Sequence, residues 1–155
     1  SGASTVGNGN GWDVVVTHSG LYDGLNLFAG ISSVEQNATI GDLDSEAYGF
    51  TFAIGGATIG YQTSEMDNVA ASGTFYDTDA YAVSYSVNDD LTISYGIAEG
   101  KSNSGSTGEV EAKSFQVSYT VGGASVVFAE SDVDNQNYVS GTTRSGRTVA
   151  VTLAF

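Results

Sequence analysis

The sequence predicts an all-β fold, an antiparallel transmembrane β-barrel to which this chain contributes about nine strands. Apolar residues alternate with small polar residues over one segment after another, the period of a β-strand. Tight turns alternate with longer polar loops along the chain, the layout of barrels that cross an outer membrane. The second face of the expected strands carries mostly Ser, Thr, Gly and Ala instead of the charges that a water-exposed sheet would need.

The expected strands form four hairpins and one closing strand. They lie at 12–16 with 25–31, 48–54 with 57–63, 81–87 with 91–97, 115–121 with 124–128, and 147–155. Their tight turns fall at Tyr22-Asp23-Gly24, Gly55-Gly56, Asn88-Asp89-Asp90 and Gly122-Gly123, which are residue types that favour turns. Longer polar loops are expected near 35–45, 65–77, 101–111 and 132–145. Residues 1–11 are expected to form the tail of an external loop, and 12–155 the barrel strands.

The apolar face of these strands is predicted to meet lipid, with aromatic residues toward its edges as a girdle. A soluble β-sandwich is the other all-β possibility, but its outer face would carry Lys, Glu, Arg and Gln. The expected girdle residues are Trp12, Tyr48, Tyr61, Tyr85, Tyr95, Tyr119 and Phe155.

Composition excludes several functions. The formal net charge of −14 makes nucleic acid a poor partner, because phosphate binding needs clustered cations. The 155 residues include no Cys and a single His, His18, so thiol catalysis and a histidine-pair metal site are excluded. The acids around Asp44 and around Asp132 lack the full pattern of a calcium loop. We therefore expect no enzyme activity, metal or cofactor.

The last residues suggest a relationship. Phe155 follows Leu153, Val151 and Val149 at every second position. This resembles the C-terminal signature of bacterial outer-membrane proteins, which the barrel assembly machinery reads. Arg147, one step further back, departs from that apolar pattern.

Three further segments resemble the general porins of Gram-negative bacteria. They are Gly11-Trp12-Asp13-Val14, Tyr22-Asp23-Gly24-Leu25 and Asp90-Leu91-Thr92-Ile93-Ser94-Tyr95-Gly96. The acidic, proline-free style is similar to alphaproteobacterial and marine members. The resemblance implies an outer-membrane location and a sixteen-stranded, usually trimeric barrel. This chain would form its C-terminal part, and the remaining strands would lie either on a separate chain or outside the given sequence.

The resulting hypothesis is a water-filled pore for passive diffusion of ions and small hydrophilic solutes. Acidic loops at its mouth would favour cations. Lys113 and Arg147 have the parity of the outward face, where they could pair with lipopolysaccharide phosphates. The residues expected to line the pore are Asp13, Thr51, Thr58, Gln62, Ser84, Ser86, Thr92, Ser94, Ser114, Gln116, Ser118, Thr120, Thr148 and Thr152.

Two other architectures remain open. One is a small structural or adhesive barrel of eight strands over 25–155, with residues 1–20 as an extra segment. Its narrow interior would need bulky side chains to fill it. The other is a polymerising β-protein that uses open sheet edges.

Overall fold

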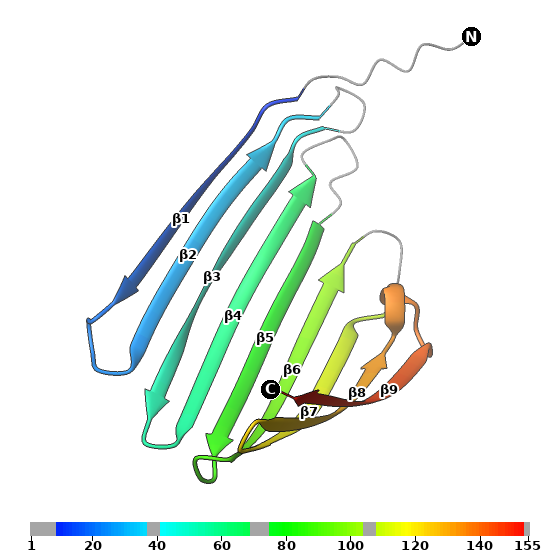
Figure 1. Ribbon diagram of the computed structural model, residues 1–155. Helices are drawn as coiled ribbons and strands as arrows, with labels where there is room; N and C mark the ends of the chain where they lie inside the picture. The colour runs from blue at the N-terminus through cyan, green and yellow to red at the C-terminus, as the bar shows by residue number, and fades with distance from the viewer. Residues whose placement is uncertain (1–8, 37–40, 69–74, 104–107, 154–155) are drawn as a thin grey trace.

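The computed structural model describes residues 9–36, 41–68, 75–103 and 108–153, and this part of the chain forms a single antiparallel sheet (Figure 1). Its nine strands follow one another in sequence order, and each strand pairs with the next. The strands are β1 (Gly11–Ser19), β2 (Leu25–Val34), β3 (Leu43–Ile54), β4 (Ala57–Asn68), β5 (Phe75–Ser86), β6 (Leu91–Ser102), β7 (Val110–Val121), β8 (Ala124–Asp134) and β9 (Thr143–Leu153). The predicted nine-stranded antiparallel arrangement is confirmed.

Tight turns join the hairpins at one end of the sheet. Gly55 and Gly122 open two of these turns with φ of +57°, which glycine adopts without steric cost. In the β5–β6 turn, the side-chain oxygen of Asn88 accepts hydrogen bonds from the backbone N–H groups of Asp90 and Leu91, at 2.9 and 2.8 Å. We name this end of the sheet the turn end and the opposite one the loop end.

Several strands continue into segments that the sequence assigned to loops. β4 reaches Asn68 and β5 begins at Phe75, inside the loop expected over 65–77, and β9 begins at Thr143 rather than at 147. The apolar alternation stops earlier than the strands do. Backbone pairing continues past it, because the backbone groups of an antiparallel ladder pair whatever side chains they carry.

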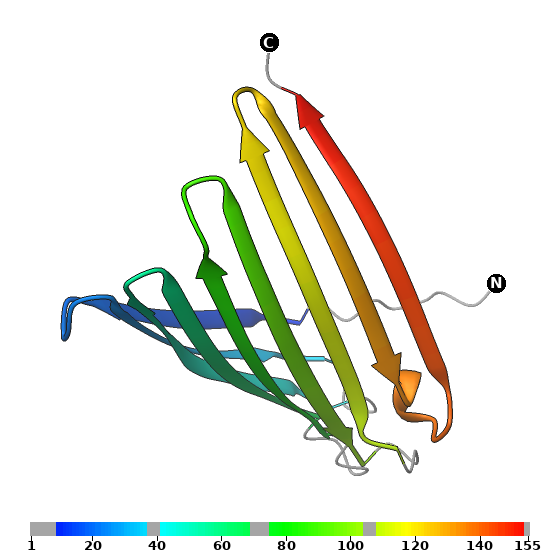
Figure 2. The ribbon, with the colours of Figure 1, turned by 90° about the horizontal axis from the view of Figure 1, so that it is seen from below.

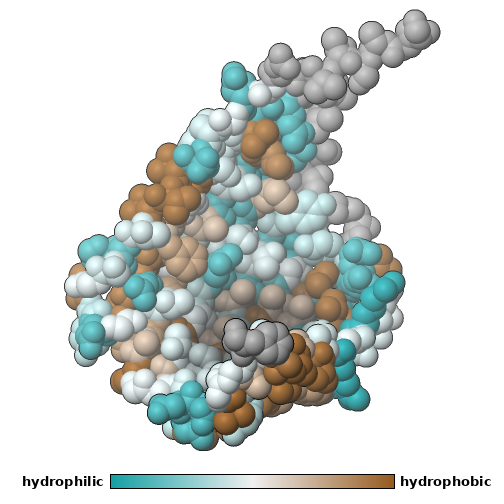
Figure 3. Space-filling view, in the orientation of Figure 1, coloured by the Kyte–Doolittle hydropathy of each residue, from teal (hydrophilic) through white to brown (hydrophobic). Residues whose placement is uncertain are grey.

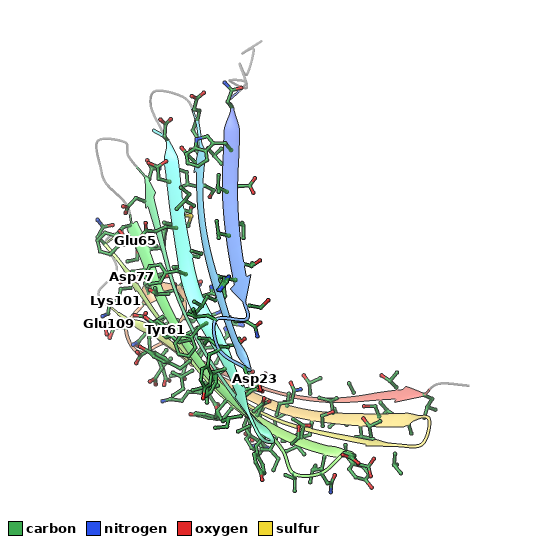
Figure 4. The ribbon with its side chains drawn as sticks, turned by 90° about the vertical axis from the view of Figure 1, so that its left-hand side faces the viewer. Asp23, Tyr61, Glu65, Asp77, Lys101 and Glu109 are labelled. Atoms are coloured by element: carbon green, nitrogen blue, oxygen red, sulfur yellow. The ribbon has the colours of Figure 1, made fainter. Side chains whose placement is uncertain are left out.

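The sheet is strongly bent, so one of its faces is convex and the other is concave (Figure 2). Side chains directly opposite each other on paired strands lie on the same face. Phe50 faces Tyr61, and Tyr61 faces Tyr81, so these rings share one face. Figure 4 places Tyr61 on the convex side of the bend. We name this convex side the outer face and the concave side the inner face.

The outer face is uncovered in the described part of the chain. No hydrophobic side chain there is buried, and the sheet is one layer thick. Val83 on β5 is 43% exposed and Val149 on β9 is 67% exposed. Contiguous apolar surface of this kind marks an interaction site.

Helix is confined to one short segment of the described residues, the 3-10 helix η1 (Gln136–Tyr138) between β8 and β9. None of the described residues belongs to a helix that is long and apolar enough to cross a membrane.

Gly49 allows β3 and β4 to approach closely, and we predict that Gly49→Ala destabilises the sheet. The added Cβ would overlap the carbonyl oxygen of Tyr61 and would lie 2.7 Å from Phe28 Cζ and 2.9 Å from Gln62 Cα. We expect the free energy of unfolding to fall by about 1–3 kcal/mol, as for other overpacked sites. Urea unfolding of the purified protein would measure the change.

Gly60→Ala is the matched control, on the neighbouring strand. Its Cβ would have only ordinary contacts, 3.6 Å from the carbonyl oxygen of Phe50 and 3.7 Å from Thr51 Cγ2. Equal stability of the two variants would show that the close approach at Gly49 is not a constraint.

Candidate functional site

The inner face collects the residues predicted to line a pore. All fourteen, from Asp13 on β1 to Thr152 on β9, have the inner-face parity of their strands. Figure 3 looks onto this face, where hydrophilic and neutral colours predominate in the hollow of the sheet and some hydrophobic residues lie among them. Across the nine strands, only Asp13 and Arg144 put charged side chains on it, and both lie on edge strands. The inner face is therefore almost uncharged, and most of its residues are small or polar, although Val15, Phe28 and Val127 also lie on it.

Hydroxyl and amide groups pair across neighbouring strands of the inner face. Thr120 Oγ1 donates to Ser125 Oγ at 3.1 Å, and Asn26 Nδ2 donates to Thr51 Oγ1 at 3.4 Å. Each such group keeps further hydrogen-bonding capacity, because a hydroxyl has one donor and two acceptor positions. A surface of this kind can hydrogen-bond water or an uncharged polar solute.

Bulkier side chains gather on the inner face toward the loop end, a feature that the sequence analysis missed. They are Val34, Leu43, Met66, Tyr76, Val110 and Val133. A hollow of about 450 Å³ lies on this part of the inner face, and Asp13, Met66, Tyr76 and Thr78 line it.

The outer face carries an apolar band next to the turn end. Rings of Phe50 and Tyr61 lie 6.3 Å apart, and those of Tyr61 and Tyr81 lie 5.0 Å apart, so aromatic contacts cross three strands. The predicted girdle residues from Trp12 to Tyr119 share this face, as do Val149, Val151 and Leu153 of the expected assembly signal. Phe155 lies outside the described residues.

Toward the loop end the outer face changes abruptly to an acidic belt. The belt consists of Asp44, Glu46, Glu65, Asp67, Asp77, Asp79, Glu99, Glu111, Glu130, Asp132 and Asp134. Its cations are paired with carboxylates: Arg147 Nη2 lies 2.7 Å from Glu130 Oε1, and Lys113 pairs with Glu111. At its lower edge, Tyr61 Oη donates to Asp79 Oδ1 at 2.7 Å.

This belt corrects the expectation that the acids within 35–45, 65–77, 101–111 and 132–145 occupy loops at a pore mouth. They are strand residues that face away from the inner face, so they do not support the expected preference for cations. Their parity was the available signal, since Asp44 and Glu46 continue the alternation of Tyr48 and Phe50.

The boundary between the apolar band and the acidic belt crosses the strands obliquely. Glu46 on β3 faces Glu65 on β4, and Glu65 faces Asp77 on β5. Asp79, two residues nearer the turn end of β5, is also charged, whereas its partner Thr63 on β4 is not. On β5 the boundary has therefore moved two residues toward the turn end.

The same displacement recurs twice. Asp79 faces Glu99, which faces Glu111, but Lys113 is already charged on β7. Lys113 faces Asp132, but Glu130 is already charged on β8, and Glu130 faces Arg147 on β9. Three two-residue shifts over six strand intervals amount to one residue per strand. With about 3.3 Å per residue and about 4.8 Å between strands, the boundary makes an angle of about 35° with the strand perpendiculars.

The tight turns descend in parallel with this boundary. The last pair before the β3–β4 turn is Ile54–Ala57, and Ala57 faces Tyr85 on β5, which faces Ile93 on β6. β6 continues two residues past Ile93, to Leu91, before the β5–β6 turn. Leu91 faces Tyr119 on β7, and β7 continues two residues past Tyr119, to Val121, before the β7–β8 turn. The apolar band therefore keeps nearly the same width across the sheet.

Among the described residues, no group of three His, Asp or Glu side chains could hold a metal ion. His18 lies on the outer face opposite Leu27, on an exposed edge strand.

Comparisons with known proteins add no relationship. No family model matches the chain, and no curated protein matches it.

The acidic belt opposes like charges across four strands in the row Asp79, Glu99, Glu111 and Asp134. Directly opposed like charges destabilise a sheet. We predict that Glu99→Gln raises the melting temperature by a few degrees at pH 7 and low salt. The gain should shrink in high salt, because salt screens exposed charges.

Thermal unfolding followed by circular dichroism would measure this effect. Asp23→Asn, in the β1–β2 turn at the other end of the sheet, removes the same charge outside the row. A gain for Asp23→Asn as large as that for Glu99→Gln would point to net charge instead of cross-strand repulsion.

Proposed function

We propose that the sheet is part of the wall of an outer-membrane β-barrel whose inner face lines a water-filled pore for small hydrophilic solutes. The oblique boundary on the outer face carries this proposal. Strands of membrane barrels tilt by about 35–45° from the barrel axis, so a lipid boundary parallel to the membrane must cross them obliquely. The angle of about 35° derived from the register agrees with that tilt.

The apolar band also has a definite height. From Tyr48 to Ile54 on β3 it covers seven residues, or about 20 Å between the terminal Cα atoms, which is about 16 Å along the membrane normal for a strand tilted by about 35°. The terminal side chains extend this height toward the roughly 25 Å of outer-membrane barrels. Lipid would cover the apolar surface that nothing else in the described structure covers.

The opposite edges of the sheet need further strands. β1 and β9 are its two edges in the described structure, and lipid does not tolerate unpaired backbone groups. Closing nine strands with antiparallel neighbours throughout requires an odd number of additional strands. Seven would complete the sixteen-stranded, usually trimeric barrel of the porins that the sequence resembles, and another chain could supply them.

The eight-stranded alternative is less well supported. β1 pairs with β2 along its whole length, from Gly11 opposite Val34 to Ser19 opposite Asn26, and occupies the edge that such a barrel would close. Small inner-face residues such as Gly60, Ala82 and Gly96 would also leave a narrow barrel hollow. The polymerising alternative would leave the outer apolar band without lipid.

The membrane surroundings follow from the same orientation. The acidic belt would lie at the level of the lipopolysaccharide headgroups, with Lys101, Lys113 and Arg147 as its positive groups. Val149, Val151 and Leu153 project from the exposed edge strand β9, where the assembly machinery could read them.

Cysteine scanning tests the orientation of the two faces, because the chain has no native Cys. We predict that Ser84→Cys and Ser118→Cys react rapidly with a water-soluble maleimide in proteoliposomes. Val83→Cys and Val117→Cys, their outer-face neighbours, should react slowly. A fluorophore attached to either of these two cysteines should be quenched by a quencher attached to lipid. Equal reactivity of the two pairs would contradict the proposal.

Planar-bilayer recording tests the pore itself. We predict stable ohmic steps from the assembled barrel, and a lower conductance after a bulky methanethiosulfonate reagent modifies Ser84→Cys. The same reagent should leave the conductance of Val83→Cys unchanged, because that side chain faces lipid. A folded protein that inserts into the bilayer but conducts no current would refute a water-filled pore.

A further inference from the structure

The β8–β9 connection, residues 135–142, folds across the inner face. The Tyr138 ring lies 5.6 Å from that of Tyr76 on β5, although Tyr138 follows β8, three strands away. It also covers Gly100 on β6, where an added Cβ would lie 3.4 Å from Tyr138 Oη. Gly100 is the only buried residue in the described part of the chain. Figure 1 shows η1 at the loop end of β7, β8 and β9.

Polar contacts hold this connection, which we name the strap, to its neighbours. Asn135 Nδ2 donates to the backbone carbonyl of Glu109 at 2.8 Å, and Asn135 Oδ1 accepts from the Gly141 N–H at 2.9 Å. The Gly108 N–H donates to the Tyr138 carbonyl at 3.2 Å. The strap is therefore attached both to the segment that leads into β7 and within itself.

The backbone of the strap is strained. Asn135, Asn137 and Tyr138 have φ of 53°, 57° and 60°, a left-handed conformation that is uncommon for a residue as bulky as tyrosine. Such strain persists where the surrounding contacts compensate for it, and it clusters at functional sites. Here the strained conformation directs an aromatic ring onto the inner face.

We propose that the strap narrows the loop-end mouth of the pore and that Tyr138 is the residue that limits solute size there. This inference rests on the proposed pore, since it assigns a role to a residue that projects over the pore wall. The Tyr138 ring is uncharged at physiological pH, since the ordinary tyrosine pKa of 10.0 lies well above it and desolvation by burial raises the pKa of Tyr138 further. An uncharged ring at this position would select by size and not by charge.

The first test measures the position of the strap without requiring a pore. Thr78 faces Gly100 across β5 and β6, next to the Tyr138 ring. The thiol of Thr78→Cys in detergent-folded protein should react slowly with a water-soluble maleimide, and adding Tyr138→Asn should accelerate the reaction several-fold. Asn tolerates left-handed backbone, so this change removes the ring and preserves the turn.

Ser84→Cys, on the same strand and face but toward the turn end, is the labelling control and should not respond to Tyr138→Asn. Tyr138→Phe keeps the ring and should keep the thiol of Thr78→Cys protected. Equal labelling of Thr78→Cys with and without the ring would overturn the strap as a cover of the inner face.

The second test measures size selection by the swelling of proteoliposomes in uncharged sugars of increasing size. Tyr138→Asn should raise the entry rate of the larger sugars several-fold relative to that of the smallest, and Tyr138→Phe should behave like the original chain. An unchanged ratio in a conducting protein would refute size selection by Tyr138. If neither the original chain nor either variant admits any sugar, the proposed pore is refuted, and so is the size limit assigned to Tyr138.

Discussion

Backbone hydrogen bonding between consecutive strands is the constraint on which the rest of this structure depends. The described residues have no buried hydrophobic core, so packing between layers does not hold the sheet together. An antiparallel ladder places directly opposed residues on the same face, and its side chains alternate with a period of two. The ladder therefore sorts the side chains of nine strands into an outer face, which carries the apolar band and the acidic belt, and an inner face of mostly small and polar residues. A shift of one residue in any strand would exchange its two sets.

The same register determines how the sheet would meet a membrane. Strand pairing alone, without any surrounding molecule, moves the first charged side chain toward the turn end by an average of one residue per strand from β3 to β9. The tight turns descend equally. Two boundaries that run parallel to each other and oblique to the strands are expected for a band of lipid around tilted strands. Staggered turns alone would occur in any barrel of tilted strands, so the informative feature is the exposed apolar band that follows them.

The alternation, the Gly-Gly turns and the Asn88 turn made the order of the strands predictable, because each is a local property of the chain. Strand ends at the loop end were not predictable from the apolar pattern. Glu65 and Asp77 were assigned to a loop by their charge, whereas backbone pairing extends the strands through both residues. The position of Tyr138 over Tyr76 could not be predicted either. It depends on a left-handed turn after Asp134 and on contacts across three strands.

The orientation of the strands in a membrane shows whether lipid covers the outer face. Polarised infrared spectroscopy of the protein in oriented lipid bilayers measures the angle between the strands and the membrane normal. We predict an ordered sheet with strands tilted by about 35–45°, close to the angle of the boundary. Strands that lie in the plane of the bilayer, or a protein that does not associate with it, would contradict the assignment of the outer face to lipid.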